Sequence, residues 1–179
     1  KAIDLFTQYL QERKDTGRIY LMNVDHANDH GAFDPKLAPI KQSNLCCEIN
    51  LPTQPLQDIN GEEGEISLCT LSAINWGLID KPSDFEKYCG IAVRALDALL
   101  DYQAYPVRAA EKSTMNRRPL GIGIINLAYF LAKRGLKYND DALATIDEYT
   151  EAWSYHLIKA SADLAVEKGS IENVCDTKY

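Results

Sequence analysis

An amide, a thiol and a carboxylate stand at alternating positions of the chain, as Asn44, Cys46 and Glu48. In an extended segment, alternate side chains project to the same side. The spacing therefore predicts that these three groups face one small site. On spacing alone, the pattern also fits a loop with a single buried thiol. The other side chains of the segment are expected to point the opposite way, into packing: Leu45, Cys47 and Ile49.

The cysteines follow no regular spacing, no C-x-x-C motif occurs, and no secretion signal precedes them. We therefore interpret them as catalytic or buried thiols rather than as a disulfide framework. His26 and His30, four residues apart, could hold a metal ion on a helix. However, Asn23 to His30 is predicted to be a strand end and loop, so no metal site is expected. The five cysteines are Cys46, Cys47, Cys69, Cys89 and Cys175.

The elements that must position these groups follow from hydrophobic periodicity. Strands separated by helices indicate an α/β architecture with parallel strands. The connection over residues 25–65 is unusually long for a compact domain, and such loops are usually functional. Helices are predicted over residues 2–14, 84–102 and 126–134, and a last helix from Asp140 or Asp141 to Gly169. Strands are predicted over residues 18–24, 66–71 and 120–125.

Two of the predicted helices carry a clear apolar face. A capping box of Ser83 and Glu86 is expected to start the helix over residues 84–102. On the last helix, His156 falls on the buried stripe and is interpreted as a hydrogen-bonded core residue. The strand over residues 120–125 is also predicted to be buried. The apolar face of the helix over residues 84–102 comprises Phe85, Cys89, Ala92, Leu96 and Leu99, with Cys89 as a small core side chain.

The composition is that of an ordinary globular protein. The 179 residues include 19 basic and 26 acidic side chains, which gives a formal charge of −7. This charge provides no general attraction to nucleic acid or to anionic membranes, so neither is expected as a partner. Residues 1–13 lack the apolar core of a signal peptide, and the stretch over residues 119–132 is too short to span a bilayer. We therefore expect a cytoplasmic protein.

Seven short blocks of the sequence closely resemble the large catalytic subunit of class I ribonucleotide reductase. The central one is SNLCCEI, which contains Cys46, and it is followed by LPT and by EISLCTLSA, which contains Cys69. The resemblance runs along almost the whole chain and weakens over about the last forty residues. The blocks occupy residues 16–20, 23–26, 43–49, 51–53, 65–73, 94–103 and 117–123.

The resemblance implies a ten-stranded α/β barrel of which this chain is an incomplete part, with residues 1–179 as a single segment and a finger loop over about residues 42–52. It implies that Cys46 becomes a thiyl radical and removes the 3′-hydrogen of a ribonucleoside diphosphate. Glu48 matches the base that accepts the 3′-hydroxyl proton, and Asn44 matches the amide that binds the ribose. Cys69 matches one of two thiols that reduce the substrate. Cys47 departs from the family pattern, which usually has no thiol at this position.

The resemblance also implies partners for the chain. No cofactor is expected to bind to this chain itself. The radical would come from a small subunit with a di-iron tyrosyl centre, ATP and deoxynucleotides would act as effectors, and thioredoxin or glutaredoxin would act as reductant. The remainder of the large subunit and a second large subunit would complete a homodimer.

Two alternatives stay open at this point. The segment could be a non-catalytic α/β assembly fragment of the same family, inactive alone. It could also be a thiol–disulfide module that uses Cys46, Cys47 and Cys69, although the lack of C-x-x-C makes this reading weak.

Overall fold

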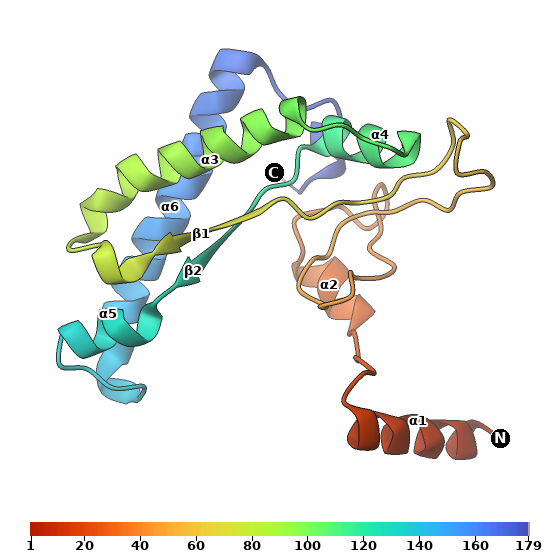
Figure 1. Cartoon of the computed structure of the whole chain (residues 1–179), viewed down its shortest axis with the longest axis horizontal. Coiled ribbons are helices and arrows are strands. Elements are labelled where there is room, and N and C mark those ends of the chain that lie inside the picture. The colour runs from red at the N-terminus through yellow and green to blue at the C-terminus, as the bar shows by residue number, and fades with distance from the viewer. Residues whose placement is uncertain (179) are drawn as a thin grey trace. The chain divides into compact units, whose positions relative to one another are not determined.

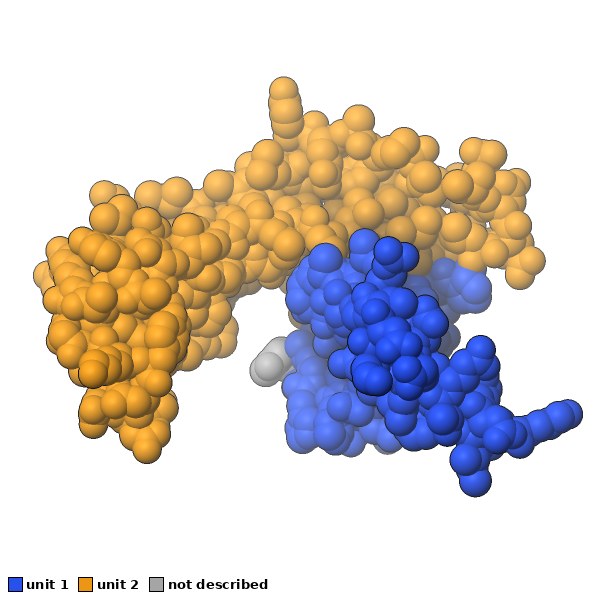
Figure 2. Space-filling view, turned by 60° about the horizontal axis from the view of Figure 1, so that its bottom comes forward, with its two compact units in different colours: residues 1–55, 175–179 blue, residues 56–174 orange. Residues whose placement is uncertain are grey.

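The computed structural model describes residues 1–178, which fold into two compact units (Figure 2). Unit 1 consists of residues 1–55 together with the chain end from residue 175, and unit 2 consists of residues 56–174. The predicted finger loop therefore belongs to unit 1, whereas Cys69 belongs to unit 2. None of the helices over residues 1–178 is long and apolar enough to cross a membrane.

Unit 1 begins with the predicted helix. Helix α1 (Ala2–Thr16) ends at Gly17, which has a positive φ of 65° and whose N–H donates to the carbonyl of Arg13. This left-handed backbone is the usual end of a helix and favours glycine. The prediction of a helix over residues 2–14 is confirmed, with two more residues at its end (Figure 1).

The predicted strand over residues 18–24 is wrong. Helix α2 (Val24–His30) occupies its last residue and the first part of the predicted long connection, whereas residues 31–65 carry no helix or strand, as expected. Its stability depends on distant partners. The side-chain amide of Asn28 donates to the carbonyl of Ile40 and accepts from the N–H of Ile40, and Lys178 Nζ donates to the carbonyls of Asn28 and Asp29. These partners lie far away in sequence, so local periodicity gives no sign of the helix.

Unit 2 is built around two parallel strands, as predicted. Strand β1 (Leu71–Asn75) pairs with β2 (Gly121–Ile125) in a register that opposes Leu71 to Gly121 and Asn75 to Ile125. The helices α3 (Phe85–Tyr102) and α4 (Arg108–Arg117) lie in the connection between the two strands. The prediction for β2 is confirmed within one residue. However, β2 is not buried, since its residues from Gly123 onward are exposed.

Strand β1 starts at the residue where the predicted strand over residues 66–71 ends. Most of that predicted strand lies instead along α4, where the N–H of Ile66 donates to the carbonyl of Ala109. Helix α4 was not predicted. Its buried residues are small or polar, so they leave no apolar stripe in the sequence: Ala109, Ala110, Ser113 and Thr114.

Helices α5 (Leu127–Lys133) and α6 (Leu143–Lys168) follow β2, and buried residues of both pack in the core of unit 2. The predicted start signals were wrong for two helices. Asp84 accepts from the N–H of Lys81 before α3, and the residue before α6 is Ala142, which gives no side-chain cap. The predicted stop at Gly169 is confirmed. The elements are η1 (Trp76–Leu78), η2 (Pro82–Asp84), α5 (Leu127–Lys133), η3 (Asp140–Ala142), α6 (Leu143–Lys168) and η4 (Val174–Asp176), of which η4 crosses from unit 2 into unit 1.

Four aromatic rings form the centre of this core. Trp76 is fully buried, and its ring centroid lies 5.4 Å from those of Phe85 and Phe130 and 6.1 Å from that of Tyr149. Helices α3 and α6 cross and pack against each other (Figure 1). On α3 the buried face is rotated from the predicted one, because Leu99 is 49% exposed. Val93 and Leu100 are buried on this helix together with the predicted Phe85, Cys89 and Leu96.

Candidate active site

The finger loop forms a tight turn rather than an extended strand. The N–H of Cys47 donates to the carbonyl of Asn44 over 3.0 Å, which closes a turn with Leu45 and Cys46 at its tip. Cys47 has a positive φ of 63°, a left-handed conformation that reverses the chain after the turn. The predicted alternation of side chains is therefore wrong here.

The turn nevertheless joins two of the three predicted groups. The side-chain amide nitrogen of Asn44 donates to Glu48 Oε1 over 2.5 Å. The side-chain oxygen of Asn44 accepts from the N–H groups of Glu48 and Ile49 over 3.2 and 3.1 Å. Asn44 thus holds both the carboxylate and the backbone that carries it. Cys46 is exposed at the tip of the same turn.

The three residues expected to point into packing differ in their exposure to solvent. Leu45 is 86% exposed, so the prediction for this residue is wrong. Cys47 and Ile49 are half-buried, which agrees with their predicted direction. The hydroxyl of Ser43 donates to the carbonyl of Ile49 over 2.6 Å and closes the base of the loop. The loop therefore leaves Leu45 and Cys46 exposed and Cys47 half-buried.

Cys69 lies in unit 2, between the segment along α4 and the start of β1. Its side chain is exposed. The carbonyl of the next residue, Thr70, accepts from the N–H of Gly121 over 2.9 Å, which ties it to β2. The residues before it are held by Glu65, whose carboxylate accepts from Arg117 Nη1. Sequence reasoning missed this ion pair, although the block RRPLGIG contains its arginine.

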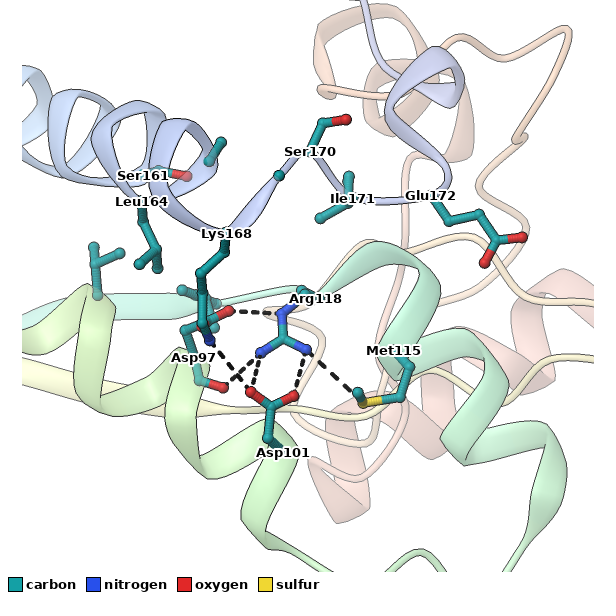
Figure 3. Close-up of a pocket in the computed structure, with 14 residues that line it drawn as sticks. Asp97, Asp101, Met115, Arg118, Ser161, Leu164, Lys168, Ser170, Ile171 and Glu172 are labelled. Carbon is teal, nitrogen blue, oxygen red and sulfur yellow. Dashed lines mark hydrogen bonds and ion pairs between the residues drawn. The ribbon is translucent and has the colours of Figure 1, made fainter.

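The second arginine of that block forms a separate cluster of charges (Figure 3). Arg118 Nε donates to Asp97 over 2.6 Å, and its two terminal nitrogens donate to both carboxylate oxygens of Asp101 over 2.7 and 2.9 Å. Lys168, at the end of α6, also donates to Asp97. The cluster joins α3, the end of α4 and the end of α6, and its role is therefore structural.

The pKa values in this cluster follow from its geometry. Burial acts to raise the pKa of Asp97, but the hydrogen bonds from Arg118 and Lys168 outweigh burial, so the pKa lies below its ordinary value. The hydrogen bond from Arg118 is the main cause of the lowered pKa of Asp101. The same two carboxylates raise the pKa of Arg118, first Asp101 and then Asp97.

Two other residues with possible chemistry, Cys89 and His156, lie in unit 2. Cys89 is fully buried, as predicted, and burial raises the pKa of its thiol to about 11. Its thiol donates to the carbonyl of Trp153 over 3.8 Å. His156 was predicted to be a hydrogen-bonded core residue. It is half-buried on α6, and its Nδ1 is buried without a hydrogen-bond partner among the described residues. Neither residue belongs to the finger loop.

The histidine pair lies on a helix after all. The rings of His26 and His30 on α2 have centroids 5.9 Å apart. Over residues 1–178, no group of three or more histidine, cysteine, aspartate or glutamate residues could hold a metal ion.

Two parallel strands joined by a helical crossover define an α/β segment, and one loop of the chain exposes the thiol of Cys46. The family model described as "Ribonucleotide reductase, barrel domain" matches residues 1–179. The chain therefore belongs to the ribonucleotide reductase barrel domain family.

Several curated proteins match the chain over its whole length. It is 55% identical over 180 residues to the ribonucleoside-diphosphate reductase subunit alpha of Haemophilus influenzae and 54% identical over 180 residues to the ribonucleoside-diphosphate reductase 1 subunit alpha of Escherichia coli. The subunit alpha of Enterobacteria phage T4 is 45% identical over 184 residues. In these comparisons the chain is covered completely, but it spans only about a quarter of the length of the relatives: 24%, 24% and 23%.

A solved structure shares the fold. The class Id ribonucleotide reductase alpha subunit of Actinobacillus ureae matches 98% of this chain and 34% of its own chain, with a TM-score of 0.78 and 24% identity. The predicted α/β barrel class is thereby confirmed, as part of a barrel domain with two strands in the described residues.

Proposed function

We infer that residues 1–179 form the active-site segment of a ribonucleoside-diphosphate reductase alpha subunit, in which Cys46 carries a thiyl radical. The observation that carries this proposal is the finger loop. It exposes the thiol of Cys46 at the tip of a turn and holds the carboxylate of Glu48 through the amide of Asn44. A thiol, a carboxylate and an amide in one short loop are the groups that radical reduction of a ribose requires.

The three residues of the loop have different roles in the proposed reaction. The Cys46 thiyl takes the hydrogen atom from the 3′-carbon and becomes a thiol, which leaves a carbon radical on the ribose. Glu48 accepts the proton of the 3′-hydroxyl, a task that suits a carboxylate within hydrogen-bond reach of it. Asn44 binds the ribose. An S–H bond is nearly as weak as the C–H bond it replaces, so Cys46 can return its hydrogen atom to the 3′-carbon at the end.

The two electrons for the reduction come from two thiols. Cys69 is one of them, and the second is a cysteine thiol in the remainder of the alpha subunit. The 2′-hydroxyl leaves as water, and the two thiols become a disulfide after they have given up two electrons and two protons. The balance is therefore one ribonucleoside diphosphate and one dithiol converted to one deoxyribonucleoside diphosphate, one disulfide and one water. A reductant of the thioredoxin or glutaredoxin class restores the dithiol.

The proposed assembly follows from the same family. The remainder of the alpha subunit completes the barrel, two alpha subunits form a homodimer, and a small subunit with a di-iron tyrosyl centre supplies the radical. ATP and deoxynucleotides act as effectors, and the enzyme works in the cytoplasm in DNA precursor synthesis. The relatives' names as ribonucleoside-diphosphate reductase alpha subunits support this proposal.

The test uses a complete alpha subunit that contains this segment, together with its small subunit. Cys46→Ala should abolish formation of deoxynucleotide, and Glu48→Gln should lower kcat by about 100-fold or more. Cys175→Ala is the matched control, since this exposed thiol lies outside the finger loop, and it should leave the rate within about twofold of wild type. Turnover by Cys46→Ala would refute the proposal.

A further inference from the structure

A nearly buried ion pair joins α4 to the segment that leads to Cys69. Arg117 Nη1 donates to Glu65 Oε2, and the two side chains are only 7% and 11% exposed. Another arginine of α4 offers a contrast. Arg108 also pairs with an acidic residue of the preceding segment, Glu62, but these side chains are 52% and 80% exposed. Only the first pair is shielded from water, so its geometry is much more strongly determined.

Further contacts fix the register of this segment along α4. The N–H of Ile66 donates to the carbonyl of Ala109 over 3.1 Å. The hydroxyl oxygens of Ser67 and Ser113 lie 3.5 Å apart. Ala109 and Ser113 are 1% and 3% exposed, so the segment covers this face of the helix. Three consecutive residues are thus attached to α4.

Cys69 follows these attached residues and precedes another fixed point. The carbonyl of Thr70 accepts from the N–H of Gly121 over 2.9 Å, which joins the chain to β2. Cys69 is therefore exposed between two anchored stretches, with only Leu68 separating it from the first of them. The direction of its thiol depends on how these stretches are held.

The far end of α4 is itself held in place. The next residue, Arg118, has a positive φ of 43°, so its side chain leaves the helix in a different direction from that of Arg117. It binds Asp97 and Asp101 on α3 (Figure 3). The two neighbouring arginines therefore connect α4 to two different partners, and Arg117 transmits the position of α4 to the Cys69 segment.

We propose that Arg117 is a positioning residue for Cys69, and that its buried ion pair with Glu65 fixes the direction in which the thiol of Cys69 meets the substrate. This inference rests on the proposed function, in which Cys69 is one of the two reducing thiols. Arg117 acts through Glu65 and the segment over residues 65–70 and does not touch the substrate.

The experiment uses a complete alpha subunit that contains this segment, with its small subunit, and the variants Arg117→Met, Arg117→Lys and Glu65→Gln. It also includes the exchange of both charges, Glu65→Arg with Arg117→Glu. The matched control is Arg108→Met, which removes the exposed pair on the same helix. Three quantities are measured: kcat and KM for the nucleoside diphosphate, the yield of product in one turnover by pre-reduced enzyme, and the rate at which iodoacetamide labels Cys69, read by mass spectrometry.

The expected result separates positioning from simple loss of stability. Arg117→Met and Glu65→Gln should lower kcat by about tenfold or more, because small displacements of a reacting group are costly. The KM for the nucleotide should stay the same, the single-turnover yield should fall, and the labelling rate of Cys69 should change. Exchange of the two charges should restore part of the activity, and Arg108→Met should behave as wild type.

Two results would overturn the inference. One is wild-type kcat and Cys69 labelling in folded Arg117→Met and Arg117→Lys. In the other, Arg117→Met unfolds, whereas Arg117→Lys and the exchanged pair stay folded and Cys69 is labelled at the wild-type rate. This second result would mean that the ion pair contributes to stability alone. Cys69→Ser separates this inference from the proposed function. Full steady-state activity in Cys69→Ser would refute the reducing role of Cys69, whereas an inactive Cys69→Ser beside fully active Arg117 variants would refute only the positioning role.

Discussion

The side-chain amide of Asn44 donates a hydrogen bond to the carboxylate of Glu48, with 2.5 Å between nitrogen and oxygen. The same amide group accepts from two backbone N–H groups of the loop, so all of its polar atoms are engaged in shaping the turn. One residue therefore determines where the proposed base lies and how the loop that carries it is folded.

Substitution of this amide should damage both binding and chemistry. We expect Asn44→Ala to lower kcat by about 10- to 100-fold in a complete alpha subunit, because the carboxylate of Glu48 loses its fixed position. KM should rise as well, since Asn44 is proposed to bind the ribose. Steady-state kinetics measure both effects. Asn50→Ala, at an exposed position of the same loop, is the control. Equal kinetics for the two variants would contradict this role of Asn44.

The left-handed backbone at Cys47 leads to a second prediction. A β-branched side chain is strongly disfavoured at positive φ, whereas glycine accepts this conformation without strain. We expect Cys47→Gly and Cys47→Ser to keep kcat close to wild type and Cys47→Val to lower it by about tenfold, because the turn opens and Cys46 is displaced. The three variants are compared in the same activity assay. Loss of activity in both Cys47→Gly and Cys47→Ser, which lack the thiol but tolerate the turn, would show that the thiol of Cys47, and not its backbone, matters.

The cluster around Arg118 predicts a large effect on stability. Arg118→Met leaves the carboxylate of Asp97, which is 6% exposed, without its main partner. Removal of one member of such a buried pair costs about 3–5 kcal/mol in the free energy of unfolding. Urea titration of the 179-residue chain measures this loss. Arg94→Met serves as the control, because Arg94 and Glu167 pair in the open and should contribute little.

The same cluster predicts how stability depends on pH. The pKa values of Asp97 and Asp101 are lower in the folded chain than in the unfolded one, through the contacts with Arg118 and Lys168. Their stabilising effect should be complete above about pH 4 and should be lost as the pH falls through the lowered values. The difference in unfolding free energy between wild type and Arg118→Met should therefore shrink in acid. A difference that stays constant from pH 7 to pH 2 would contradict this explanation.

Cys89 should react with iodoacetamide much more slowly than the exposed thiols do. Its pKa of about 11 compares with an ordinary value of 9.0, so at pH 8 it forms about 100-fold less reactive thiolate. Iodoacetamide at pH 8 should label Cys46 and Cys69 in the folded chain and spare Cys89 until urea unfolds it. Because the folded pKa is raised, the stability due to this thiol should be present below about pH 9 and lost as the pH rises toward 11. Rapid labelling of Cys89 before unfolding would show that its surroundings open readily.

The elements that were predicted correctly are those whose signals are local. Helix α3 carries an apolar stripe over five turns, and β2 is a short apolar run that ends in a helix start. Helix α2 was missed because its carbonyl groups are bound by Lys178, at the other end of the chain. Helix α4 was missed because alanine, serine and threonine fill its buried face. Periodicity detects large apolar side chains and cannot detect a close fit of small ones.

In the candidate site, too, only the features with local sequence signals could be predicted. Spacing alone suggested only that Asn44, Cys46 and Glu48 face one site, and their proposed roles came from the family resemblance. The geometry that joins Asn44 and Glu48 was not predictable from alternation, since it depends on the positive φ of Cys47. The anchoring of the Cys69 segment by Arg117 was also hidden, because its two partners are 52 residues apart and belong to elements that the sequence did not reveal.

Unit 1 is made of two stretches that are far apart in sequence, and this has a consequence for how the chain folds during synthesis. Its closing contacts join Ala32, Phe33 and Asp34 to Lys178, Thr177 and Asp176, whereas unit 2 is one continuous stretch over residues 56–174. A ribosome delivers all of unit 2 before it delivers the residues that close unit 1. Unit 2 can therefore fold before residues 176–178 leave the ribosome, whereas unit 1, with its finger loop, can close only after they have emerged.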